Sequence, residues 1–205
     1  MTKAKEVIKI INDAKEGTLF CIKDFLDITS YDNAKLILSR LENRNVIKRA
    51  YDGLYYRPSY SKIAQRYVPV SPLEFVSKIA ELNKWHIILY GDSALNYLSL
   101  STQVPATFEF VTDGPYREYV FDGMKIRFRH TNFNYIKVLS NKSATLIEAL
   151  RFLGKDRVDE KIIDALKLRM TNKEIKELIE FKQYYPVWIY KIIYKLGGMY
   201  IDKAI

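Results

Sequence analysis

Cysteine is nearly absent from the 205-residue sequence, in which Cys21 stands alone. A single cysteine can form neither an internal disulfide nor a multi-cysteine zinc site, and such scarcity is typical of a protein kept in a reducing cytosol. We expect Cys21 to be a small buried hydrophobe.

Glycine, proline and long apolar runs are also scarce. The chain has 8 glycines and 6 prolines, while 48% of its residues are hydrophobic, a balance that argues against extensive disorder. Crossing a bilayer takes about twenty consecutive apolar residues, and no such run occurs. Lys3, Lys5, Glu6 and Lys9 interrupt the N-terminal segment, which is unlike a signal peptide. The sequence therefore predicts a folded cytoplasmic protein with no membrane contact.

Positive charge is in excess and is concentrated in the first third of the chain. The formal net charge is +9; residues 1 to 70 hold 13 Lys and Arg against 8 Asp and Glu, and residues 71 to 205 hold 20 against 16. Excess charge also serves solubility, so its placement is more informative than its size. The distribution points to an anionic partner, such as double-stranded DNA, at the N-terminal end.

The segment from Ser30 to Arg44 has the spacing of an amphipathic helix. Ala34, Ile37, Leu38 and Leu41 form one apolar stripe, and Thr29 and Ser30 supply the N-cap. The remaining surface could enter a major groove, with Leu36 meeting a thymine methyl group, although an ordinary solvated helix face is the alternative. On this prediction the DNA-facing residues are Tyr31, Asn33, Lys35, Leu36, Ser39, Arg40, Asn43 and Arg44.

A basic hairpin follows this helix at once. Residues 46–50 and 54–57 are strand-like and flank Tyr51-Asp52-Gly53, in which Asp-Gly favours a tight turn. We predict that Lys48, Arg49 and Arg57 contact DNA phosphates or the neighbouring minor groove from this hairpin, and that Tyr51 also belongs to the DNA-binding surface. With helices expected over 2–14 and 22–26 and a short strand over 18–20, residues 1–58 are predicted to be a winged helix-turn-helix domain.

The rest of the chain is predicted to be a polar linker followed by a second domain. Residues 59–71 are the linker, with room for one irregular turn of helix, and residues 72–205 are a mixed α/β domain. Its small sheet spans 85–130, with strands at 85–90, 107–112, 116–121 and 124–130, and its helices fall at 72–84, 91–98, 144–153, 159–168, 172–184 and 187–196. The fold class is therefore α+β, with a winged helix-turn-helix first and a helical segment last.

Asp122-Gly123 predicts a second hairpin, in which Tyr119 lies opposite Ile126 and Glu118 opposite Arg127. One face of this hairpin is apolar. The other carries Lys125, Arg127 and Arg129. This basic strip is either a second nucleic-acid surface or a solvated sheet face partly neutralised by Glu118.

Catalytic and metal-binding patterns are not found. Gly91-Asp92-Ser93 after a strand could hold a nucleotide phosphate, as in nucleotidyltransferases. Those enzymes also need two metal-binding carboxylates one residue apart on the next strand, where this chain has Glu109 and then Val111. His86 and His130 lack a spaced ligand set. We therefore predict neither catalysis nor a metal or cofactor, with a degenerate nucleotidyltransferase as the alternative.

Several motifs resemble those of the AbiEi-like antitoxins of bacterial type IV toxin-antitoxin systems. They are GLYYRP at 53–58, Ser71-Pro72, GDSALN at 91–96 with Leu98, STQVP at 101–105, TDGP at 112–115 with Arg117, and FRHT at 128–131. Ser99 departs from the family pattern, which has glycine in a Leu-Gly-Leu run. The resemblance implies a winged-helix regulator that binds its own promoter and represses its operon. It also implies a nucleotidyltransferase-like toxin as functional partner, with no direct contact required.

Two points about such a regulator stay open at this stage. A winged-helix transcription factor without a toxin partner would have the same architecture. If two copies bind one operator as a dimer, their half-sites should be about 10 base pairs apart or a multiple of that.

Overall fold

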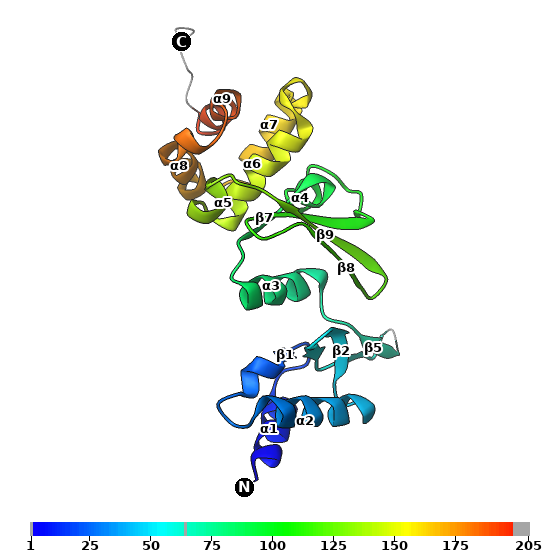
Figure 1. The fold of residues 1–205 in the computed structure, drawn as a ribbon. Coiled ribbons are helices and arrows are strands. Elements are labelled where there is room, and N and C mark those ends of the chain that lie inside the picture. Colours follow the sequence, from blue (N-terminus) through cyan, green and yellow to red (C-terminus); the bar gives the residue numbers. More distant parts are fainter. Residues whose placement is uncertain (1, 64, 199–205) are drawn as a thin grey trace. The chain divides into compact units, whose positions relative to one another are not determined.

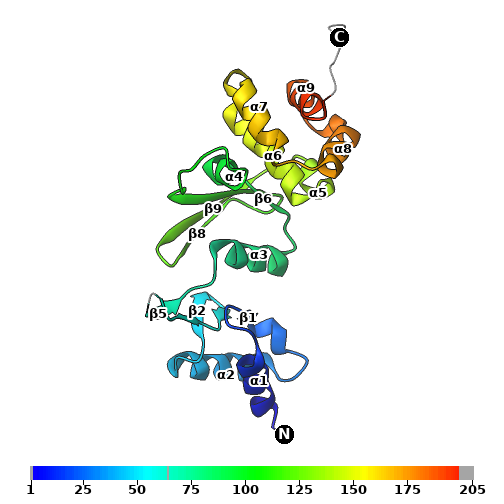
Figure 2. The same ribbon diagram turned by 180° about the vertical axis from the view of Figure 1, so that it is seen from behind.

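A computed structural model describes residues 2–63 and 65–198 of the chain (Figures 1 and 2). The protein is α+β and forms two compact units, residues 1–79 and 80–205. The division falls inside helix α3 (Pro72–Asn83), whereas the sequence signals place the start of a second domain near Pro72. That helix begins as predicted, because Ser71 and Glu74 exchange hydrogen bonds of 2.9 and 3.2 Å between side chain and backbone.

Three helical segments build the core of the first unit. They are α1 (Lys3–Asp13), the 3-10 helix η1 (Ile22–Phe25) and α2 (Tyr31–Asn43). The apolar stripe predicted for α2 is confirmed, since all four of its members are buried. These side chains join one cluster with residues of the other two segments and with Ile47. Its members include Val7, Ile11, Ile22, Phe25, Ala34, Ile37, Leu38, Leu41 and Ile47.

A three-stranded antiparallel sheet accompanies these helices. Strands β1 (Leu19–Cys21) and β2 (Lys48–Tyr51) both pair with β3 (Leu54–Tyr56), so the early strand expected near 18–20 joins the sheet of the hairpin. Cys21 is buried, as expected. Its backbone N–H donates to Asp24 Oδ2 at 2.8 Å, and its thiol lies 3.3 Å from Asp24 Oδ1.

Residues 59–68 form a second hairpin where the sequence predicts a linker. Strands β4 (Ser59–Ser61) and β5 (Arg66–Val68) pair antiparallel, and the rings of Tyr60 and Tyr67 meet edge to face with centroids 5.3 Å apart. The prediction is wrong here because three-residue strands are too short to show an alternating pattern. Cross-strand aromatic contact supplies the stabilisation that this polar segment otherwise lacks.

The second unit contains a four-stranded sheet in the order β6-β7-β9-β8. Its strands are β6 (Ile87–Leu89), β7 (Thr107–Thr112), β8 (Arg117–Phe121) and β9 (Met124–His130). The predicted register of the Asp122-Gly123 hairpin is confirmed, with Tyr119 opposite Ile126 and Glu118 opposite Arg127. Strands β7 and β9 are parallel, so their carboxyl ends lie at the same edge.

The two faces of this sheet differ in chemistry. Phe110, Tyr119 and Phe128 are buried on one face, and the rings of Phe110 and Tyr119 lie 5.7 and 5.5 Å from that of Phe128. Glu109, Arg127 and Arg129 alternate with them on the other face, as the period of two dictates.

Helices cover the sheet and complete the second unit. They are α4 (Gly91–Tyr97), α5 (Tyr135–Val138), α6 (Asn141–Leu153), η2 (Lys155–Arg157), α7 (Glu160–Lys167), α8 (Asn172–Glu180), η3 (Lys182–Tyr184) and α9 (Val187–Leu196). The sequence missed α5, which is a single turn, and ran α8 into η3. Residues 144–150 of α6 are buried throughout, which makes it the central helix of the main cluster. Among the described residues, every helix is too short or too polar to cross a lipid bilayer.

Candidate nucleic-acid interface

Helix α2 presents a continuous polar and basic surface opposite its buried stripe. Tyr31, Asn33, Lys35, Leu36, Arg40, Asn43 and Arg44 are exposed, and Ser39 is half-buried. Lys35, Arg40 and Arg44 form no ion pair with any residue that the structure describes. Leu36 is 47% exposed, so roughly half of its side chain meets solvent. The predicted residues of this helix therefore lie together on one accessible face.

Arg49 on β2 is partly occupied by neighbours within the unit. Its Nη2 lies 3.2 Å from Glu42 Oε2 and donates to the Tyr55 hydroxyl at 3.1 Å, and Nη1 lies 3.8 Å from Asp52 Oδ1. The hydrogen bond with Glu42 raises the pKa of the Arg49 guanidinium. This side chain is 46% exposed, so a phosphate can reach it only in competition with Glu42.

Lys48 and Tyr51 occupy the two ends of the same strand. The Lys48 ammonium lies 5.3 Å from the centre of the Tyr67 ring, a cation–π contact that joins β2 to β5. Tyr51 is 42% exposed at the turn of the hairpin. Both residues stay at the surface of the first unit, as predicted.

Arg57, unlike the other predicted residues, binds backbone carbonyl oxygens within the first unit. Its Nη1 donates to the carbonyl oxygens of Asn12, at 2.5 Å, and of Ala14, at the C-terminal end of α1. Helix α1 has no basic residue in its own last turn, so Arg57 provides the cation that complements the helix dipole there. We therefore assign Arg57 to the packing of the first unit and not to a DNA-facing surface, which corrects the sequence prediction.

The β4–β5 hairpin adds basic residues that the sequence analysis left in the linker. Lys62 and Arg66 are exposed and pair with no carboxylate in the described part of the chain. Exposed Tyr60 and Tyr67 lie on the same hairpin. These residues lie near tyrosines in the sequence, but strand pairing was needed to show that they share one hairpin.

The basic strip of the second unit is largely neutralised. Arg127 lies 2.7 Å from Glu118 and 2.9 Å from Glu109, and Arg129 lies 2.8 Å from Glu109. The hydrogen bond from Arg127 lowers the pKa of Glu118. Lys125 is exposed at the start of the strip. This surface offers less free positive charge than α2, which favours the alternative of a solvated, self-paired sheet face.

Gly91-Asp92-Ser93 has a packing role in the structure. Ser93 is buried, and its hydroxyl accepts the Glu109 backbone N–H at 3.1 Å. Gly91 has φ +61°, and a β-carbon there would lie 3.0 Å from Glu109 Oε2. The positive φ therefore favours glycine at this position, while the Glu109 carboxylate is a flexible neighbour.

The two histidines are hydrogen-bonded within the second unit. His86 Nδ1 lies 2.9 Å from Asp113 Oδ2, while His130 contacts the Gly114 carbonyl and the Asn132 side chain at 2.8 and 2.9 Å. Burial acts to raise the pKa of Asp113, but hydrogen bonds from His86 and Lys137 outweigh it, so the pKa lies below its usual value. The described part of the chain holds no group of three or more His, Cys, Asp or Glu side chains arranged to bind a metal ion.

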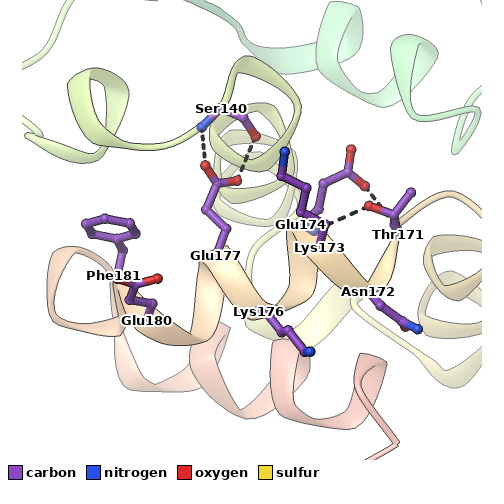
Figure 3. A pocket seen from close by; sticks show the side chains of 9 residues that line it. All are labelled: Ser140, Thr171, Asn172, Lys173, Glu174, Lys176, Glu177, Glu180 and Phe181. Carbon is purple, nitrogen blue, oxygen red and sulfur yellow. Dashed lines mark hydrogen bonds between the residues drawn. The ribbon is translucent and has the colours of Figure 1, made fainter.

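A pocket of about 790 Å³ borders α8, and its polar groups are engaged in helix capping (Figure 3). Thr171 and Glu174 form a capping box at the start of α8. Glu177 accepts hydrogen bonds from the Ser140 backbone N–H at 2.8 Å and from the Ser140 hydroxyl at 2.7 Å. Thr171, Glu174, Ser140 and Glu177 therefore stabilise helix starts.

These observations define an α+β protein of two units, in which the first unit presents a helix with exposed lysine and arginine side chains and a small antiparallel sheet. The chain belongs to the family described as "Family of unknown function (DUF6088)", whose model matches residues 6–178. None of the curated proteins compared with the chain matches it. Among solved structures, the chain is similar to the RV2827C protein from Mycobacterium tuberculosis, at 14% identity and a TM-score of 0.46 over 97% of this chain and 77% of that one.

Proposed function

We propose that the protein is a DNA-binding transcriptional regulator whose first unit is a winged helix-turn-helix domain with α2 as its recognition helix. The observation that carries this proposal is the surface of α2, where Lys35, Arg40 and Arg44 are exposed and unpaired in the described structure. Unpaired cations on one helix can form base and phosphate contacts without first breaking an internal ion pair.

The two hairpins supply the expected companion surface. In this proposal β2 and β3 form the wing, and Lys48 and Arg49 approach phosphates beside the groove that α2 enters. Lys62 and Arg66 of the β4–β5 hairpin extend the positive surface within the same unit. Phosphate contacts of this kind set affinity and its salt dependence more than sequence choice.

The resemblance to AbiEi-like antitoxins supports a more specific role. We propose that the regulator acts in the cytoplasm on its own promoter and counteracts a nucleotidyltransferase-like toxin, without catalysis of its own. The motif at 112–115 belongs to the second unit, where a β-carbon on Gly114 would overlap the Trp85 ring at 2.4 Å. That motif is therefore explained by packing, and it supports kinship of the second unit more than any particular site.

Titration of the DNA upstream of this gene tests the regulator. Arg40→Ala should cost about 1 to 3 kcal/mol on the cognate site and relax its specificity, because a base contact is lost. Arg49→Ala should weaken all DNA similarly and lower the salt slope by roughly one. Arg169→Ala, an exposed arginine of the second unit, is the matched control. Unchanged binding by both Arg40→Ala and Arg49→Ala would contradict the helix and wing assignment.

A further inference from the structure

A pocket of about 500 Å³ opens in the second unit, where the parallel strands β7 and β9 end. Helix α6 and the segment between β9 and α5 also line it, together with Tyr90, which follows β6, and Tyr116, which precedes β8. In open sheets with parallel strands, ligands bind beyond the carboxyl ends of those strands, and pockets of this volume suit small molecules. The residues that matter here are Tyr90, Tyr116, Arg129, Phe133, Glu148 and Arg151.

Arg151 is the group in this pocket with the most unused hydrogen-bonding capacity. Its guanidinium lies 4.0 Å from the centre of the Phe133 ring, which fixes its plane from one side. Within the described structure the guanidinium donates no hydrogen bond and forms no ion pair. Guanidinium groups held in this way bind phosphate or carboxylate oxygens in a bidentate manner.

A second arginine, Arg129, lines the same pocket but already has partners. The Arg129 guanidinium lies 5.2 Å from the centre of the Tyr90 ring, and its Nη2 lies 2.8 Å from Glu109 Oε1. Glu109 therefore takes up much of its charge. Arg129 contributes positive potential and packs against the Tyr90 ring, while Arg151 is the group open to a ligand.

Glu148 is the carboxyl group of this pocket that could compete with an anionic ligand for Arg151. It is 2% exposed and accepts a hydrogen bond from the Tyr135 hydroxyl. Burial raises the pKa of Glu148, so its uncharged form is favoured relative to an exposed glutamate. The charge of Arg151 acts on this pKa in the opposite direction, so the two side chains interact electrostatically.

Aromatic rings form the remaining walls, although the Phe133 ring is already stacked on Tyr135, with centroids 5.5 Å apart, and packed by Arg151. Tyr116 is 59% exposed and Phe133 is 42% exposed, although both line the pocket. Planar rings beside an arginine with free donors match a ligand that has both a flat ring and a phosphate.

We propose that this pocket binds a nucleoside monophosphate, with the phosphate on Arg151 and the base against the aromatic walls. The site lies wholly in the second unit and is independent of DNA binding by the first. Phosphate contributes the charge-assisted bidentate contact, and the base contributes stacking, so neither part alone should bind as well as the whole.

Calorimetric titration of the full chain tests this site. The probes are AMP, GMP, CMP and UMP, with inorganic phosphate and the four free nucleosides as comparisons. At least one monophosphate should bind more tightly than phosphate and than its own nucleoside. Arg151→Met should weaken that binding about 10- to 100-fold, since hydrogen bonds to a charged group are lost. Phe133→Leu should weaken it as well, while Arg169→Met should leave it unchanged.

Several results would overturn the proposal. They are the absence of binding by all four monophosphates at millimolar concentration, equal binding of phosphate alone, and unaltered affinity in both Arg151→Met and Phe133→Leu. Binding of single-stranded oligonucleotides but of no mononucleotide would also overturn it, in favour of a strand-binding surface. Circular dichroism verifies that each variant is folded. DNA titration with the same variants separates this site from the regulator function, because they should bind promoter DNA normally.

Discussion

Arg57 closes the end of a helix that lies more than forty positions earlier in the chain. Its guanidinium binds the Asn12 and Ala14 carbonyls, and these would otherwise be unpaired acceptors at the C-terminus of α1. A charged donor shared between two such carbonyls contributes to the stability of the unit and leaves little capacity for DNA.

We predict that Arg57→Ala lowers the free energy of unfolding by about 1 to 3 kcal/mol, because hydrogen bonds to a charged donor are lost. Its affinity for promoter DNA, measured below the melting temperature, should stay close to that of the wild type. Thermal denaturation and a DNA titration on the same sample provide both values. A variant of normal stability with weakened binding would return Arg57 to the DNA surface.

At the level of single residues, sequence reasoning placed side chains on a surface but could not assign their partners. Lys35 and Arg40 were predicted to be accessible on α2, and they are, because helical periodicity alone decides which way they face. The ion pair of Arg49 with Glu42 and the contact of Arg57 with α1 depend on how separate elements pack. Arg151 was not singled out, since its free donors become apparent only once Phe133 lies beside it.

Among the elements, the N-cap of α6 is held by a side chain from another helix. Ser140 is the N-cap, and Glu177 of α8 accepts hydrogen bonds from it (Figure 3). Glu177 also accepts a hydrogen bond from the Ser143 hydroxyl. Burial acts to raise the pKa of Glu177, but these hydrogen bonds outweigh it, and the pKa lies below the ordinary value. A carboxylate at a helix N-terminus is also favoured by the helix dipole.

Glu177→Ala should therefore destabilise the protein by about 1 to 3 kcal/mol, whereas Glu180→Ala in the same pocket should change stability little. Because the folded-state pKa of Glu177 is lowered, its contribution is fully present above the unfolded-state pKa of about 4.3 and is lost as pH falls through the folded value. Urea denaturation at neutral pH and below pH 4 measures this. A difference between the two variants that persists unchanged in acid would contradict the capping role.

Elements differ in how well the sequence predicts them. The helices at 31–43 and 187–196 and the strands at 107–112 and 124–130 follow from clear periodicity and turn signals. The β4–β5 hairpin and the one-turn helix α5 were missed, because segments of three or four residues are shorter than any repeat that defines a pattern. Ser99 has φ +57°, a left-handed conformation that no local sequence pattern predicts for a serine.

On the scale of the whole molecule, sequence signals give the boundaries of elements better than those of compact units. Ser71, Pro72 and Glu74 correctly mark the start of α3, yet the two units divide within that helix. Unit boundaries depend on which residues touch, and no local signal records that. The α+β class could be predicted because it needs only the types of element present.

The solitary cysteine gives the first unit an intrinsic chemical reporter. Cys21 is 4% exposed, and burial together with Asp24 raises the pKa of its thiol, so a thiol reagent can react only when the surrounding structure opens. The labelling rate of the unmodified chain should therefore measure the opening of this unit alone. Arg57→Ala should accelerate labelling, and Glu177→Ala should not. Equal acceleration by both would mean that the two units open in one event.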